Sequence, residues 1–253
     1  MSGHSKWHSI KHKKAKEDTK RGNLFGKLSK SIIIAIKDGN GVSDPKDNIA
    51  LANAIAKAKE NNMPQANIDR AIKRGTGEIE GETYESIVYE GYGPGGIAII
   101  VEALTENRNR TASDLRNTFS KYGGNLGENG SVNWQFERKG LIIIEKDTVK
   151  DEEEFILEAI DHGVEDIEKV GDFFEVKVEP IDFIKVKESF ETAGISIKNS
   201  ETGLTPMSKI KISVEEGKKA LKLINALEDH ADIQHVSYNI DLSDEIFNAG
   251  NER

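Results

Sequence analysis

The spacing of apolar residues divides the chain into a helical part and parts that are rich in strands. Between residues 20 and 75, apolar side chains recur every three or four positions, which is the period of helices that bury one face. Three helices are expected there. The second is expected to open at Ser43 or Asp44 with Pro45 in its first turn, and the third to follow Pro64. This stretch therefore predicts a small helical domain.

Beyond an acidic, glycine-rich linker at 75–83 the period changes from 3.6 to 2, which indicates strands. Two strands flank the sequence GYGPGG at 91–96. Its glycine spacing matches a dinucleotide-binding loop, but it leads into a strand rather than a helix, so a hairpin turn is expected. A helix follows, for which Thr111 and Asp114 resemble a capping box, and SVNWQFE at 131–137 predicts another strand.

Residues 139 to 202 alternate in the order strand, helix, strand, strand, helix, strand, which is the ferredoxin-like arrangement. A strand at 208–213, a helix and a closing strand follow, and we expect them to complete the sheet that begins at residue 84. The sequence therefore predicts an α+β fold of three domains, an N-terminal helical domain followed by two α/β domains, one of them a βαββαβ unit inserted in the other. The expected domains are 1–78, the discontinuous 79–138 with 205–253, and the inserted 139–204.

Charge is distributed unevenly between these parts. Residues 1–74 hold sixteen Lys and Arg against seven Asp and Glu, a net charge of +9. Residues 75–253 hold nineteen against thirty-seven, a net charge of −18. A basic end on an acidic body indicates that one end meets a polyanion, while the alternative is a basic face that is merely solvated.

Several classes of function are disfavoured by the sequence. It has no cysteine, no apolar run near the roughly 20 residues that cross a bilayer, and no secretory signal, so a cytoplasmic protein without a membrane partner is expected. It carries no nucleophile elbow, P-loop or zinc signature, so we expect no enzyme, cofactor or small-molecule substrate. His4, His8 and His12 share a helical spacing, but the outer two would lie about 12 Å apart, too far to share one metal ion.

The basic N-terminal arm is the main candidate for binding nucleic acid. Lysines on flexible stems suit phosphates, and Trp7 among them either stacks on an exposed base or pins the arm to the helical domain. Arg108 and Arg110, just before the expected start of the helix that follows the hairpin, and Arg116 on that helix are a second candidate, unless they pair with acids of the same body. The candidate nucleic-acid ligands are Lys6, Trp7, Lys11, Lys13, Lys14, Lys16, Lys20, Arg21, Lys27, Lys30, Arg108, Arg110 and Arg116.

Four long motifs resemble one known family. They are GHSKWHSIKHKKAKEDTKRGNLFGKLSKSI, NNMPQANIDRAIKRG, YEGYGPGGIAIIVEALTENRNRTASDLRNTFSKYGGNLGENGSVNWQFERKG and LINALEDHADIQHV. Together they closely resemble the YebC/PmpR family over essentially the whole chain. The resemblance implies three domains and a non-enzymatic regulator of gene expression. Members are described mainly as probable transcriptional regulators that bind DNA, while some relatives are mitochondrial translational activators or ribosome-associated forms.

Three hypotheses remain open at the level of sequence. The leading one is a cytoplasmic regulator of transcription that binds DNA through its basic N-terminal domain. The second is a ribosome-associated translation factor that uses the same arm on rRNA. The third is a scaffold whose acidic α/β domains bind a protein partner. No helix-turn-helix pattern identifies a recognition helix, so neither the target sequence nor the kind of nucleic acid is fixed.

Overall fold

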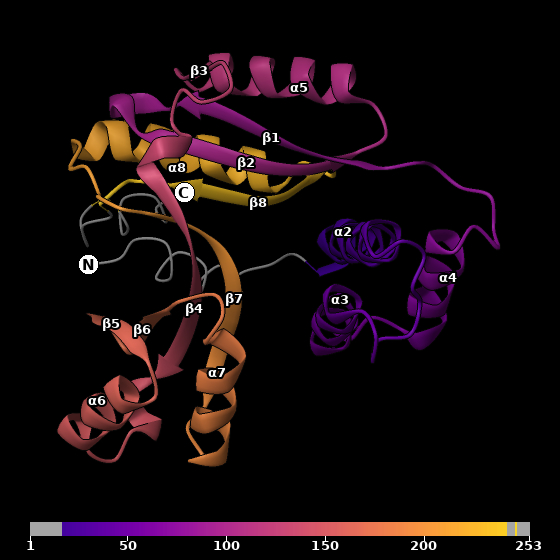
Figure 1. Ribbon diagram of the computed structural model, residues 1–253. Coiled ribbons are helices and arrows are strands. Elements are labelled where there is room, and N and C mark those ends of the chain that lie inside the picture. Colours follow the sequence, from indigo (N-terminus) through magenta and orange to yellow (C-terminus); the bar gives the residue numbers. More distant parts are fainter. Residues whose placement is uncertain (1–16, 242–245, 247–253) are drawn as a thin grey trace.

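The computed structural model describes residues 17–241 and Ile246, with side chains described from residue 22 onward apart from that of Val170. Its elements form three bodies (Figure 1). Helices α2 to α4 form one body, a sheet with α5 and α8 forms a second, and a sheet with α6 and α7 forms a third. The long strands β4 and β7 run from the second body into the third.

Three helices make up the first body: α2 (Glu17–Asp38), α3 (Ile49–Glu60) and α4 (Gln65–Gly75). Their core includes Ile32, Ile36 and Leu51, none of which has exposed surface. Burying each such side chain contributes about 1.5–3 kcal/mol. The 3.6-residue period that predicted these helices thus arises from one shared core.

The prediction that the second helix opens at Ser43 or Asp44 is wrong, because Asn48 caps it instead. The Asn48 Oδ1 atom accepts a hydrogen bond from the backbone N of Leu51 at 3.0 Å. Its Nδ2 atom donates to the backbone oxygens of Ala35 at 2.9 Å and Val42 at 3.0 Å, so one buried side chain caps α3 and also ties it to α2.

The first sheet has the strand order β3-β1-β2-β8 and is antiparallel throughout. Its strands are β1 (Glu85–Tyr92), β2 (Ala98–Thr105), β3 (Asn125–Leu126) and β8 (Ile233–Tyr238). The hairpin expected at 91–96 is confirmed, with the 3-10 turn η1 (Pro94–Gly96) between β1 and β2. Helices α5 (Arg108–Lys121) and α8 (Val214–Glu228) pack together in one core on this sheet.

The expected capping box at Thr111 and Asp114 is wrong. Helix α5 begins at Arg108, and its N-cap is Asn107, whose side chain accepts from the backbone N of Arg110 at 3.0 Å. Thr111 therefore lies inside the helix. It is fully buried, and its hydroxyl group bonds to residues of other elements, as described below.

The second sheet has the order β5-β6-β4-β7, again antiparallel, with two helices packed against it. Its elements are β4 (Phe136–Glu145), η3 (Lys146–Thr148), α6 (Glu152–Asp161), β5 (Val164–Val170), β6 (Phe173–Val178), α7 (Phe183–Thr192) and β7 (Ile197–Pro206). This is the order of a ferredoxin-like βαββαβ unit, so the predicted α+β class is confirmed.

Two predicted strands differ from the structure. The segment 131–137 contains the 3-10 turn η2 (Asn133–Gln135), and β4 starts only at Phe136. The segment 208–213 forms a single bridge, Ile210 to Ile240, because it meets only the chain just beyond β8. The first sheet nevertheless contains strands that come before the second sheet in the chain (β1 to β3) and one that comes after it (β8). The domain boundaries at 78, 138 and 204 stay a prediction.

Candidate nucleic-acid interface

Part of the predicted interface lies outside the residues that the structure describes. Lys6, Trp7, Lys11, Lys13, Lys14 and Lys16 are in that part, as are His4, His8 and His12. The backbone of Lys20 and Arg21 lies in α2, but the structure does not describe their side chains. For all of these, nucleic-acid binding stays a prediction.

Lys27 and Lys30, the next candidates along α2, contact the end of α8 and the turn that connects it to β8. The Lys27 Nζ atom donates to the backbone oxygen of Glu228 at 2.6 Å. The Lys30 Nζ atom lies 2.6 Å from Oδ1 of Asp232, donates to the backbone oxygen of Ala231 at 3.2 Å, and is 15% exposed. These two lysines therefore hold the helical body against the first sheet.

Asp232 is the centre of this contact. Its side chain is only 5% exposed, and its Oδ2 atom accepts from the Thr111 hydroxyl at 2.9 Å and from Arg110 Nη2 at 3.2 Å. Burial alone would raise the pKa of Asp232, but the bonds from Lys30 and Thr111 and the neighbouring positive charges outweigh it and lower the pKa to about 2. A carboxylate that is ionised at neutral pH thus links α2 and α5 to the turn just before β8.

The three candidate arginines of α5 differ in their surroundings. Arg110 pairs with Glu106 at 3.0 Å as well as with Asp232, as the alternative drawn from the sequence anticipated. Arg108 and Arg116 are exposed, and neither forms an ion pair with another residue that the structure describes. The structure therefore leaves Arg108 and Arg116 as the available cations of this group.

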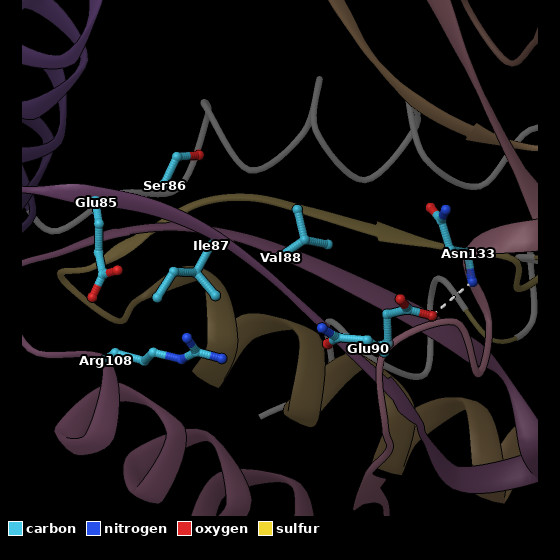
Figure 2. Close-up of a pocket in the computed structure, with 8 residues that line it drawn as sticks. Glu85, Ser86, Ile87, Val88, Glu90, Arg108 and Asn133 are labelled. Carbon is cyan, nitrogen blue, oxygen red and sulfur yellow. Dashed lines mark hydrogen bonds between the residues drawn. The ribbon is translucent and has the colours of Figure 1, made fainter. Parts of the chain in front are cut away.

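Arg108 lines a shallow hollow along the edge of β1, with a volume of 420 Å³. Strand β3 pairs only with Gly91 and Tyr92, so within the described chain the first part of β1 has an open edge. Figure 2 shows Arg108 and Glu85 on the side of β1 that also carries Ile87. The other lining residues are Ser86, Val88, Glu90, Asn129 and Asn133. Such a polar lining suits a hydrogen-bonding ligand.

Glu90, at the far end of the hollow, fixes the loop that precedes β4. Its carboxylate accepts from the backbone N atoms of Gly130 at 2.7 Å, Val132 at 2.7 Å and Asn133 at 2.8 Å. Figure 2 shows the bond from Asn133. Burial would raise the pKa of Glu90, but these three bonds outweigh it, and the pKa is lowered. Glu90 is therefore a structural anchor for the loop.

Sequence reasoning did not single out a group of exposed cations on α4. Arg70, Lys73 and Arg74 are exposed and stand at helical spacings of three and four, so they share one face. The buried Ile68 and Ala71 form the opposite face, against α2. The signal was present in the sequence as IDRAIKRG, where apolar residues alternate with cations at helical spacing.

Neither a metal site nor a membrane span is found in the described part of the chain. No group of three or more His, Asp or Glu side chains is placed there to hold a metal ion. None of the described helices is both long enough and apolar enough to cross a bilayer.

Comparison with known families identifies the chain. A family model for the TACO1/YebC protein N-terminal domain matches residues 5–78, and one for the TACO1/YebC second and third domain matches residues 84–240. The chain belongs to the TACO1/YebC family. The resemblance seen in the sequence is thereby confirmed, and the fold described above is that of a TACO1/YebC protein.

Relatives in this family include proteins named as regulators. A probable transcriptional regulatory protein of Natranaerobius thermophilus is 50% identical over 99% of this chain and 100% of its own length. Another, from Thermoanaerobacter pseudethanolicus, is 51% identical over 97% and 99%. The crystal structure of a conserved hypothetical protein from Aquifex aeolicus is 44% identical, with a TM-score of 0.82 over 93% of this chain and 96% of that one.

Proposed function

We propose that this protein is a non-enzymatic regulator of transcription that binds DNA through its basic N-terminal domain. One observation carries the proposal: residues 1–74 have a net charge of +9, whereas residues 75–253 have a net charge of −18. Phosphate backbones attract the first part and repel the second, so such a chain binds with its N-terminal end. The names of the TACO1/YebC relatives support a role in transcription.

In this proposal the basic domain makes most of the contacts with the phosphate backbone, and the acidic domains contribute fewer. They position the basic domain, through the contact of Lys27 and Lys30 with the turn before β8, and they present an acidic surface to a protein partner. Such a protein acts by binding and needs no cofactor or small-molecule substrate. We place it in the cytoplasm, where the DNA of a bacterial relative is found.

Charge reversal in the arm tests the proposal. Replacing Lys11, Lys13, Lys14 and Lys16 with Glu is expected to abolish binding of duplex DNA, measured by fluorescence anisotropy, while the circular dichroism spectrum stays unchanged. With about five phosphates neutralised, log K of the unmodified protein is expected to fall against log salt with a slope of roughly −4 to −5. Affinity would then drop several-hundred-fold between 50 and 200 mM salt.

A matched control keeps the change in net charge and moves it to another part of the chain. Replacing the exposed Lys150, Lys185, Lys218 and Lys222 with Glu is expected to leave binding largely intact. Equal losses in both variants would contradict the proposal, since binding would then follow net charge alone. Sedimentation with ribosomes that competing duplex DNA does not displace would favour the rRNA-binding alternative instead.

A further inference from the structure

Trp134 is a large apolar side chain that the fold holds in solvent. It lies in η2, just before β4, and 71% of its surface is exposed. Its neighbours Val132 and Phe136 are buried, with exposures of 0% and 7%. The buried side chains of Val132 and Phe136 thus hold the backbone on both sides of Trp134, while the indole is exposed to solvent.

The backbone around Trp134 is fixed by hydrogen bonds from several elements. Glu90 holds the preceding residues through three backbone N atoms, and the Tyr92 hydroxyl donates to the backbone oxygen of Ser131 at 2.8 Å. On the other side, the backbone oxygen of Gln135 accepts from the backbone N of Met207 at 2.9 Å. A ligand that binds here would therefore not have to order the loop.

The orientation of the indole ring is fixed as well. Its Nε1 atom donates to the backbone oxygen of Ser131 at 3.2 Å, which satisfies the only polar atom of the ring within the loop. With 71% of the residue exposed, most of what solvent reaches is the carbon surface of the ring. An aromatic ring whose only polar atom already has a hydrogen-bond partner is suited to stacking.

The charge around Trp134 differs from that of the rest of the body. Residues 123–135 contain a single charged residue, Glu128, and the exposed amides of Asn129 and Asn133. Over 108–135 the chain holds four Lys and Arg against two Asp and Glu, within a body whose net charge is −18. The loop itself therefore carries little negative charge that would repel a nucleic acid.

We propose that Trp134 stacks on an unpaired base of a single-stranded segment of nucleic acid. A base inside a duplex has both faces covered by its neighbours, so only an unpaired base offers a face to the indole. Asn133, the residue before Trp134, supplies an amide with a neutral donor and acceptor. It also lines the hollow that contains Arg108, a cation for a phosphate, together with the carboxylates of Glu85 and Glu90. This inference rests on the proposed function, because it requires that the protein binds nucleic acid.

Tryptophan fluorescence of the full chain tests the inference directly. The chain has two tryptophans, Trp7 and Trp134, so a Trp7→Phe variant reports on Trp134 alone. We expect single-stranded DNA and RNA oligonucleotides of mixed sequence to quench this fluorescence, and the corresponding duplexes to quench it much less. The two single-stranded probes distinguish DNA from RNA as the source of the base.

Binding is measured in parallel by anisotropy of labelled oligonucleotides. In the Trp7→Phe background, Trp134→Ala is expected to weaken single-strand binding by about 5- to 150-fold, the usual range for loss of one base–aromatic stack, and Trp134→Phe by much less. Leu157→Ala, which truncates another side chain exposed by 67%, is the control and is expected to have no effect.

The outcomes separate this inference from the proposed function. Binding without quenching, or binding that Trp134→Ala leaves unchanged, overturns the stacking site while the proposed function stands. Equal quenching by duplex and single strand overturns the requirement for an unpaired base. No binding of any oligonucleotide overturns both proposals.

Discussion

At the scale of single residues, the ion pairs of Asp232 decide how the helical body is attached. Replacing Asp232 with Asn keeps the shape of the side chain but leaves Lys30 and Arg110 without its charge. We expect a loss of roughly 2–3 kcal/mol in the free energy of unfolding at pH 7, measured with urea, because the largely buried Lys30 and the half-exposed Arg110 would lose a charged partner. Asp229→Asn, an exposed change in the same turn, is the control.

The pH dependence of that loss follows from the pKa of Asp232. The folded value is about 2, below the value of about 3.9 in an unfolded chain. The stabilisation is therefore complete above about pH 4 and is lost as the pH falls through the folded value. The difference between the unmodified protein and Asp232→Asn should shrink between pH 4 and pH 2, and a difference that stays constant there would contradict this assignment.

Sequence alone could not place these residues, because their partners are far away along the chain. Lys30 and Asp232 are 202 residues apart, and Arg110 and Asp232 are 122 apart. From the sequence, Lys30 and Arg110 were expected to bind nucleic acid, and nothing in it indicated that both pair with the same carboxylate. Trp134 was likewise assigned to a strand, since its alternation with apolar neighbours does not reveal the turn that Glu90 imposes.

At the scale of elements, the loop from 127 to 135 depends on the Glu90 carboxylate. In a Glu90→Gln variant the amide group presents only one acceptor oxygen to three backbone N–H donors. We expect the backbone amides of Gly130, Val132 and Asn133 to exchange with deuterium about 10- to 100-fold faster, because bonds to a charged acceptor are worth roughly 1.5–3 kcal/mol.

Two comparisons make that measurement decisive. Exchange in β2 should stay as it is, since the substitution affects a loop and not the sheet. Glu128→Gln, an exposed change in the same loop, should leave the three amides protected. If Glu90→Gln left them equally protected, the loop would be held by its buried flanks Val132 and Phe136 rather than by the carboxylate.

Elements were predictable where their signal is local. The βαββαβ order from 139 to 202 follows from periodicity that each segment carries itself. The start of α3 was not predictable, because Ser43, Asp44 and Asn48 are all suitable caps and only the bonds from Asn48 to α2 decide among them. Segment 208–213 has the composition of a strand, but the composition cannot show how much of a sheet edge is available to it.

At the scale of the whole molecule, the helical body contacts both other bodies. Lys30 pairs with Asp232 beside the first sheet, and Lys57 pairs with Glu201 of β7 at 3.3 Å. Contacts on two sides fix the direction in which the remaining cations of this body face. The exposed face of α4 therefore has a defined orientation relative to the acidic domains, whereas the cations of α2 at 27 and 30 are already engaged.

This arrangement predicts that α4 adds phosphate contacts to those of the arm. Replacing Arg70 and Lys73 with Glu is expected to reduce the salt slope of nucleic-acid binding by about 2, because each lost phosphate contact changes it by about 0.9. The same charge reversal at Lys218 and Lys222, an exposed pair on α8, should leave the slope unchanged. Lys73 also lies in the last turn of α4, where a cation stabilises the helix dipole. A lower melting temperature with an unchanged slope would assign these cations to helix stability, and a smaller slope with an unchanged melting temperature would place α4 on the phosphate backbone.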